Sequence, residues 1–437
     1  MADTPPPAQE GDQRNLLSMP MCIALVMGNM IGSGVFLLPA SLAPFGWNAV
    51  VAWGVTISGA MALAMVLARL TQALPGANGP TGFVSEAFGG LAGFLIGWVY
   101  WVSIWTAVVT IAVAAISYLS SFAPAVAATP YVPALAAMAL LWMATAINLR
   151  GARTAGQFQF ITLIIKLLPL LLVIIIAVAL IAQGKATPPP LPAEGFSFSQ
   201  INGAAALTLW ALLGFESASL AAARVRNPAV TIPRATIIGT AATGLLYLFV
   251  SSAIALLLPQ EVAVNSPAPF AAFVGLFWSP VVGSFVALFA SVSCIGALNG
   301  WVMMQGELPR TMASQGLLPS WLGQSDARGT PRQALIVSTI VASILLLMNA
   351  SKGMKPLFEF LLLLSTSATL WLYLACALAA IKLRVALPFA MFGAIYALYT
   401  LWGAGWTASG LSFALMAMGL PILWWTKRSS PAAEQPA

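Results

Sequence analysis

The sequence predicts an all-α polytopic membrane protein with about twelve transmembrane helices. Of its 437 residues, 60% are hydrophobic and only 7% are charged, and mean hydropathy is +0.94. Because a soluble domain carries roughly 25% charged residues, nearly all of this chain is expected to lie in or against a bilayer. Apolar runs of membrane-spanning length recur along the chain, and glycines interrupt one run in each half at matching places.

A helix needs about 20 apolar residues to cross the hydrocarbon core of a bilayer. The runs that meet or approach this length are 16–42, 47–73, 91–122, 131–149, 156–182, 201–223, 235–258, 278–307, 333–349, 357–381, 385–403 and 409–426. We expect 16–182 to form a first repeat of five helices and 201–381 an inverted second repeat. The Pro-rich segment 183–200 is the outer loop between them, and 385–426 adds two helices.

An even number of spans places both termini on one side of the membrane, and the basic residues choose the side. With the termini in the cytoplasm, fourteen of the 18 Lys and Arg residues lie at cytoplasmic ends and loops, three lie in outer loops, and Lys166 lies within a span. This bias explains the formal charge of +7 without a nucleic-acid partner. The polar ends 1–15 and 427–437 are expected to be cytoplasmic tails, disordered over 1–15 and 429–437.

Composition and motifs exclude several kinds of site. Histidine is absent, so no imidazole can relay protons or bind a metal. The chain has no Gly-x-x-x-x-Gly-Lys-Ser/Thr motif and no metal-ligand cluster, so we expect no metal and no cofactor. Cys22, Cys294 and Cys376 lie far apart in apolar runs and are predicted to be buried, unpaired residues.

Two glycine-containing breaks are the most informative local feature. The first is Gly28-Asn29-Met30-Ile31-Gly32-Ser33-Gly34, and the second is Trp210-Ala211-Leu212-Leu213-Gly214-Phe215-Glu216-Ser217. A broken helix is tolerated in lipid only where it lines a protected cavity, and a matching pair of breaks indicates the central site of a solute transporter. The helix that restarts after Gly32 would offer a positive dipole end to an anion such as a carboxylate. The alternative is close helix packing through Gly28 and Gly32.

Two ionisable residues lie deep in apolar runs, where charge is costly and commonly functional. Glu216 follows the second break by two residues and could bind a cation or carry a proton; otherwise it is a hydrogen-bonded structural carboxyl. Lys166 lies near the middle of its span. It could gain and lose a proton, or its charge could replace a bound sodium ion. Snorkelling to the interface is the alternative for Lys166.

Aromatic residues also occur inside the spans, at Tyr100, Trp101, Trp105, Trp210 and Trp301. Most such residues only pack. Trp210 directly precedes the second break and is the better candidate for a gate or site wall. Trp301 could meet a substrate cation with its π face.

The residues around both breaks resemble a known family. Gly28 to Ala40 resembles the first-helix motif of the amino acid–polyamine–organocation (APC) transporters, and Trp210 to Ser219, followed by Asn227-Pro228, resembles their sixth helix and the next loop. The resemblance runs from about residue 16 to 425 and is strongest to the arginine/agmatine antiporters of the family. It implies two inverted five-helix repeats with broken helices 1 and 6, a bacterial inner-membrane location and a possible homodimer.

The resemblance also implies site residues. The substrate carboxylate and α-amino group would bind at Asn29, Ile31, Gly32, Ser33 and Gly34, with carbonyls near Trp210, Ala211 and Leu213. The substrate side chain would contact Ser103, Val108, Trp301 and Leu363. Tyr100, Trp210, Glu216 and Trp301 would form the gates, and Glu216 and Lys166 would couple protons.

Several positions depart from the arginine-exchanging pattern. Val108, Ile111 and Leu363 stand where that pattern has polar residues or methionine, although Ser365 and Thr366 lie close to Leu363. An apolar wall cannot replace hydrogen bonds to a guanidinium. Lys166 resembles the lysine that proton-coupled and neutral amino-acid transporters place at a sodium position.

The sequence therefore leaves two transport functions open. One is amino acid–amine exchange of the arginine/agmatine type, and the other is proton-coupled uptake or exchange of a neutral amino acid such as alanine. A channel would need a continuous polar pore, for which too few polar residues recur along any span. An enzyme would need a catalytic cluster, and Glu216 with Lys166 is not one. We expect a non-enzymatic secondary transporter, driven by a gradient or by exchange.

Overall fold

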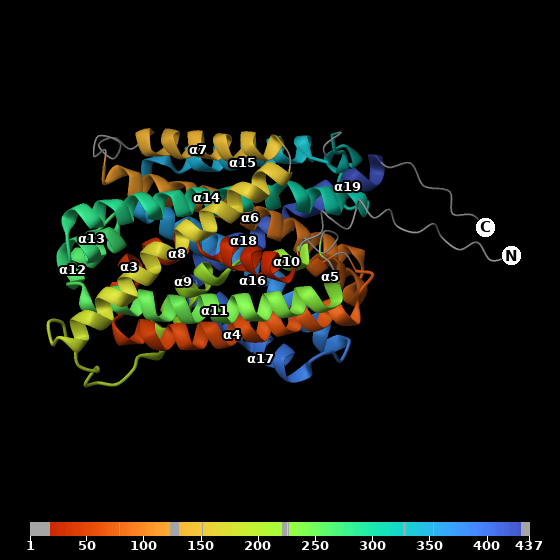
Figure 1. Cartoon of the computed structure of the whole chain (residues 1–437). Helices are drawn as coiled ribbons and strands as arrows, with labels where there is room; N and C mark the ends of the chain where they lie inside the picture. The colour runs from red at the N-terminus through yellow and green to blue at the C-terminus, as the bar shows by residue number, and fades with distance from the viewer. Residues whose placement is uncertain are drawn as a thin grey trace, which may run out of the picture.

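A computed structural model of the protein describes residues 18–77, 79–122, 131–150, 152–220, 225, 227–326, 329–352 and 354–429 (Figure 1). The predicted tail 1–15 lies outside these residues, as do positions 430–437 of the C-terminal tail. The basic residues Arg224, Arg226 and Arg328, which contributed to the predicted orientation, also lie outside them.

Each of the twelve predicted spans is helical. The first is broken into α2 (Met19–Met30) and α3 (Ser33–Leu42), and the sixth into α9 (Phe198–Leu212) and α10 (Ser217–Leu220). The other spans are α4 (Trp47–Ala73), α6 (Gly90–Ser120), α7 (Tyr131–Leu149), α8 (Ala152–Ala182), α11 (Pro228–Leu257), α14 (Pro280–Ser314), α15 (Arg332–Met348), α16 (Met354–Lys382), α17 (Leu387–Gly403), and α18 (Gly405–Ala417) with α19 (Gly419–Ser429). Within the described ranges, nine helices are long and apolar enough to cross a membrane, and α15 and α17 are shorter apolar helices.

Three short helices were not predicted, because none is long enough to span a bilayer. They are α5 (Gly79–Phe88), α12 (Gln260–Asn265) and α13 (Pro269–Phe277). Figure 1 shows α5 with α19 at one end of the long helices and α12 with α13 at the other. The short helices therefore cover the two ends of the helical assembly.

Helix α11 begins seven residues earlier than predicted, at Pro228. Proline is well tolerated in the first turn of a helix, where its missing N–H has no intrahelical partner. The residue before it, Asn227, adopts the left-handed conformation with φ +52°, so the chain changes direction just before the helix begins. Pro233 lies inside this helix rather than before it.

The helices surround a buried centre and present an apolar exterior. Helix α6 is the most enclosed of the nine long helices, since 94% of its most apolar 18-residue segment is buried. It packs against α14 and α16. Helix α4 packs against α9 and α11, and α11 also packs against α2. Large apolar side chains are exposed on the outer helices, for example Ile175, Phe249, Phe285, Ile395 and Trp402. Such a surface suits contact with hydrocarbon rather than water.

An apolar groove of about 600 Å³ lies on this exterior, among α16, α17 and α18. Its lining includes Trp371, Trp402, Trp406 and Phe413, and Trp406 is 89% exposed.

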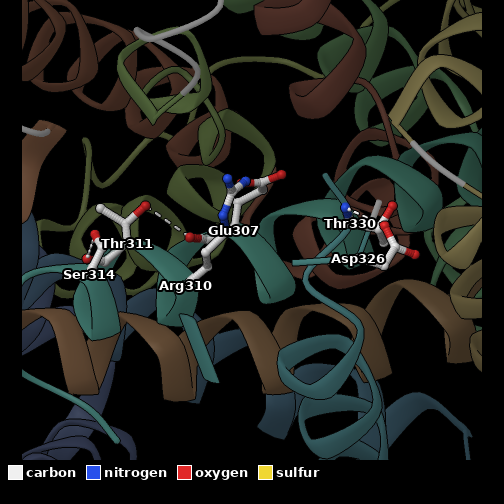
Figure 2. A network of polar contacts seen from close by, with 6 residues as sticks. All are labelled: Glu307, Arg310, Thr311, Ser314, Asp326 and Thr330. Atoms are coloured by element: carbon white, nitrogen blue, oxygen red, sulfur yellow. Dashed lines mark hydrogen bonds and ion pairs between the residues drawn. The ribbon is translucent and has the colours of Figure 1, made fainter. Parts of the chain in front are cut away.

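The end of α14 is polar, in contrast to its apolar middle (Figure 2). Arg310 pairs with Glu307 at 3.0 Å, and both side chains are about one-third exposed. The hydroxyl of Thr311 donates to the Glu307 carbonyl. Beyond the helix, Asp326 closes a turn by accepting the backbone N–H of Thr330 at 3.0 Å (Figure 2). This helix end therefore has the character of a membrane–water boundary.

Gly59 provides a test of the packing between α4 and α17. A Cβ built on Gly59 would overlap the ring of Tyr396, whereas one built on Gly54 of the same helix meets nothing within 4 Å. Overpacking a tight contact typically costs about 1–3 kcal/mol. We therefore expect Gly59→Ala to lower the thermal unfolding midpoint in detergent, and Gly54→Ala to leave it equal or higher. Equal midpoints for the two variants would contradict this packing.

Candidate functional site

The first break interrupts the hydrogen bonding between α2 and α3. Ile31 donates its N–H to the Met27 carbonyl at 2.7 Å, and α3 restarts at Ser33. Gly32 lies against α14, because a Cβ at this position would come within 2.6 Å of the Ala297 Cβ. In a continuous helix each carbonyl accepts from the residue four positions later. The break therefore leaves the last carbonyls of α2 without helical partners.

Three side chains from three other helices bind these carbonyls. Lys166 Nζ of α8 donates to the Gly28 carbonyl at 2.6 Å. Trp301 Nε1 of α14 donates to Asn29 O at 3.2 Å, and the Tyr247 hydroxyl of α11 donates to Met30 O at 2.7 Å. Lys166 is 0% exposed, so it does not snorkel to the interface. Its positive charge also suits the negative dipole end of α2.

The opposite side of the break is different, because no side-chain cap of the α3 N-terminus is present among the described residues. Its N-cap residue is Gly32, which offers no side-chain hydrogen bond. The first N–H groups of any helix have no intrahelical partner and carry a positive partial charge. Ser33 and Gly34 lie in this first turn and are buried. The first break thus combines a bonded carbonyl end with an open N–H end.

The second break contacts the first. Helix α9 ends at Leu212, and Gly214 takes a φ of +112°, which glycine adopts without strain. A Cβ on Gly214 would lie 3.2 Å from Asn29 Cβ. A Cβ on Gly34 would lie 2.6 Å from Ala211 Cα. The backbones of the two breaks are therefore in direct contact. The predicted pairing of the two glycine breaks is present in the structure.

Glu216 fastens the second break to two further helices. Its Oε1 accepts the hydroxyl of Tyr100 of α6 at 2.6 Å, and its Oε2 accepts the hydroxyl of Tyr373 of α16 at 2.7 Å. The backbone N–H of Gly214 also donates to Oε2, at 3.1 Å. Glu216 is 0% exposed. Hydrogen bonds to an ionised carboxylate are about twice as strong as neutral ones, so this cluster fixes the local conformation.

Trp210 lies at the contact between the breaks. Its Cδ1 would be 3.2 Å from a Cβ on Gly34, and its side chain is 5% exposed. The indole N–H of Trp210 has no hydrogen-bond partner among the described residues. A buried donor without a partner next to an open helix N-terminus is well placed to bind a ligand.

The remaining predicted residues form the wall on α6 and α16. Val108 and Ile111 of α6 are buried and apolar, and the Ser103 hydroxyl donates to the Tyr100 carbonyl at 2.6 Å. Ser365 of α16 donates to the Ser103 carbonyl at 2.8 Å and is 1% exposed. Leu363 is only half-buried. Ser365 therefore connects α16 to α6 beside the predicted site, and the contact of Leu363 with a substrate stays a prediction.

The two ionisable residues bind different breaks. Lys166 contacts Gly28 of the first, and Glu216 contacts Gly214 of the second. Sequence reasoning missed their companions Tyr247 and Tyr373. The only signal for these was a single tyrosine in an apolar run, which is more often a packing residue.

The fold and the site together define a class: a membrane-spanning transporter with two broken helices in contact. The chain belongs to the amino acid permease family of the APC superfamily, whose family model matches residues 17–435. Similar proteins include the cadaverine/lysine antiporter of Escherichia coli K12, 32% identical over 339 residues, which are 76% of this chain and 75% of the antiporter. The putrescine transporter PotE of the same strain is 29% identical over 402 residues, covering 90% of this chain and 91% of PotE. PotE of Haemophilus influenzae is 29% identical over 402 residues, covering 90% and 92%.

A double-mutant cycle tests the Glu216 cluster. Tyr373→Phe removes one donor to a carboxylate, which should cost about 1.5–3 kcal/mol of unfolding free energy. In a Glu216→Gln background the same change should cost less, with a coupling energy of about 0.5–3 kcal/mol. Denaturant unfolding in detergent gives all four values.

The control for this cycle is Tyr131→Phe, because Tyr131 is 63% exposed. It should change the unfolding free energy by less than about 0.5 kcal/mol. An equal cost of Tyr373→Phe in both backgrounds would show that the two side chains do not act together.

Proposed function

We propose that the protein is a secondary transporter that exchanges an amino acid for an amine by alternating access. The observation that carries this proposal is the open N-terminus of α3 beside the carbonyl end of α9, at the contact of Gly34 with Ala211. A carboxylate fits the N–H groups of α3, and an ammonium fits the last carbonyls of α9. One zwitterionic amino acid can bridge the two.

The distal part of the substrate would lie between Trp210, Trp301 and the wall of α6. Indole rings suit a cationic or an apolar chain. The relatives act, by name, on cadaverine and lysine or on putrescine, which are amines and a basic amino acid. Together with the resemblance at the breaks, this favours a basic amino acid and its decarboxylated amine. Arginine with agmatine is the first pair, and lysine with cadaverine is the next.

The Glu216 cluster supplies a candidate gate. Tyr100 and Tyr373 join α6 and α16 to the break of α9 through one carboxylate. Movement of the broken helices against α6 and α16 would have to separate these groups. A proton on Glu216 would remove the charge that strengthens both hydrogen bonds, which would link proton uptake to loosening of the gate.

The proposed function includes the remaining predictions from the sequence about location and architecture. The transporter would lie in the bacterial inner membrane with both termini in the cytoplasm. Its helices would form two inverted five-helix repeats followed by two further helices. A homodimer would need an apolar face, and the groove at Trp402 and Trp406 offers one.

Counterflow in proteoliposomes tests the exchange. Vesicles loaded with agmatine, cadaverine, putrescine, alanine or buffer would receive labelled arginine or lysine outside. We expect uptake only into vesicles that contain an amine, because an exchanger reorients to the outside only with a substrate bound. Uptake of equal size into buffer-filled vesicles would contradict exchange.

A second candidate function is proton-coupled transport of a neutral amino acid. The contact of Lys166 with the Gly28 carbonyl favours it, because a buried lysine at the break can couple its charge to the helix end. The apolar side chains of Val108 and Ile111 also suit a substrate without a distal charge.

Lys166→Met tests the second candidate. Methionine keeps most of the length of the side chain and removes its charge. Under the second candidate, proton-driven alanine uptake into empty vesicles should fall at least tenfold, the loss expected when about 1.4 kcal/mol of coupling disappears. Lys185→Met, in an exposed loop, should transport as the unchanged protein does. Proton-driven uptake that survives Lys166→Met would remove Lys166 from the coupling mechanism.

A further inference from the structure

One face of α11 carries a row of hydroxyl groups. Thr236, Thr240, Thr243, Tyr247 and Ser251 follow one another at intervals of four, three, four and four residues, which keeps them on one side of a helix. Each is at most 1% exposed. At 1.5 Å per residue the row is about 22 Å long. It therefore extends over most of the depth of the apolar layer.

All of these hydroxyls except that of Tyr247 lack a hydrogen-bond partner within the described part of the chain. Threonines on other helices donate to the carbonyl four residues earlier, as Thr71, Thr110 and Thr145 do. That local bond is the usual solution for a helical threonine in an apolar setting. The hydroxyls of Thr236, Thr240, Thr243 and Ser251 make no such bond within the described residues. Each is a buried polar group that needs an explanation.

The contacts of α11 show where the row points. Gly239 packs against Val26 of α2, and Gly244 packs against Ile57 of α4. On a helical wheel the row lies between these two glycines. Tyr247 confirms the direction, because its hydroxyl bonds Met30 O of α2 and its ring contacts Trp53 of α4 at 5.8 Å. The row thus faces the space between α2 and α4.

A polar group from α4 meets the same space. Trp53 is 1% exposed, and its indole N–H has no partner among the residues that the structure describes. Since its ring contacts Tyr247, this donor lies beside the row and not on a remote surface. Unpartnered donors from two helices therefore converge on one seam.

Water is the ligand that fits this set. It both donates and accepts, as the hydroxyls do, and a buried water makes about three hydrogen bonds. The seam offers hydroxyls one helical turn apart and an indole N–H. We propose that the space between α2, α4 and α11 holds a file of ordered water molecules bound to Thr236, Thr240 and Thr243, which ends at Tyr247 and the Met30 carbonyl.

Such a file would join the first break to one end of the molecule. Thr236 lies in the third turn of α11, toward the helix end that is predicted to be cytoplasmic. The candidate site itself is closed, because Asn29, Ser33, Trp210 and Trp301 are at most 5% exposed. The water file would hydrate the break by a separate route while the substrate site is shut. This inference rests on the fold and not on the identity of the substrate.

Radiolytic footprinting in H₂¹⁸O tests the proposal, because hydroxyl radicals formed from bound water oxidise the side chains beside it. Tyr247 and Tyr118 are a matched pair. Both are 0% exposed, and each donates its hydroxyl to a carbonyl of the first broken helix at 2.7 Å, Met30 O for one and Phe36 O for the other. We expect Tyr247 and Trp53 to gain ¹⁸O severalfold faster than Tyr118. Equal rates for Tyr247 and Tyr118 would overturn the water file.

The double variant Thr240→Val and Thr243→Val supplies an independent readout, since valine keeps the branched shape and removes the hydroxyls. Labelling of Tyr247 and Trp53 should fall to the rate of Tyr118, and the thermal midpoint should stay level or fall. In a dry seam the same changes would remove unpartnered polar groups and raise the midpoint. A raised midpoint with unchanged labelling would reject the proposal even if the protein transports amino acids normally.

Discussion

The backbone carbonyls at the end of α2 impose the constraint on which the arrangement depends. The break removes the helical partners of Gly28, Asn29 and Met30, and in an apolar surrounding these acceptors must be bonded by something else. Lys166, Trp301 and Tyr247 do so from α8, α14 and α11. One interrupted helix is thereby attached to three others. The attachment explains why a lysine is stable at 0% exposure: it has a carbonyl acceptor at a negative helix end.

The second break is held by the opposite chemistry. There the acceptor is a side chain: Glu216 accepts hydrogen bonds from Tyr100, Tyr373 and the Gly214 backbone. Between these two ends, the N-terminus of α3 has no side-chain cap within the part of the chain that the structure describes. Anchored backbone on both sides of such a helix end would suit the proposed substrate site, because a ligand could supply the missing partners. The chain belongs to the amino acid permease family, and we propose that a zwitterionic amino acid supplies these partners.

Sequence reasoning reached the spans and both breaks, because hydropathy and glycine act locally. The twelve helical segments and the burial of Glu216 and Lys166 follow from single stretches of chain, and the contact of the broken helices follows from the match between two of them. The tyrosine partners did not, since Tyr247 lies 217 residues from Met30 and Tyr373 lies 157 residues from Glu216. The hydrogen bond from Ser365 to the Ser103 carbonyl joins residues 262 positions apart, so it was not predicted either. Helix α5 and helices α12 and α13 were too short for the length criterion.

At the first break, the backbone supplies the acceptors and side chains of other helices supply the donors. This difference affects which positions can vary in sequence. The acceptors at 28 to 30 are main-chain oxygens, which every amino acid possesses. The three hydrogen bonds therefore do not depend on which side chains stand at these positions. The donors are side chains, and each is irreplaceable by most other residue types. Variation compatible with the fold should therefore accumulate at the accepting segment, within the limits of its tight packing, before it reaches Lys166, Trp301 or Tyr247. Among related sequences, the donor positions in the distant helices should therefore vary less than the residues of the break itself.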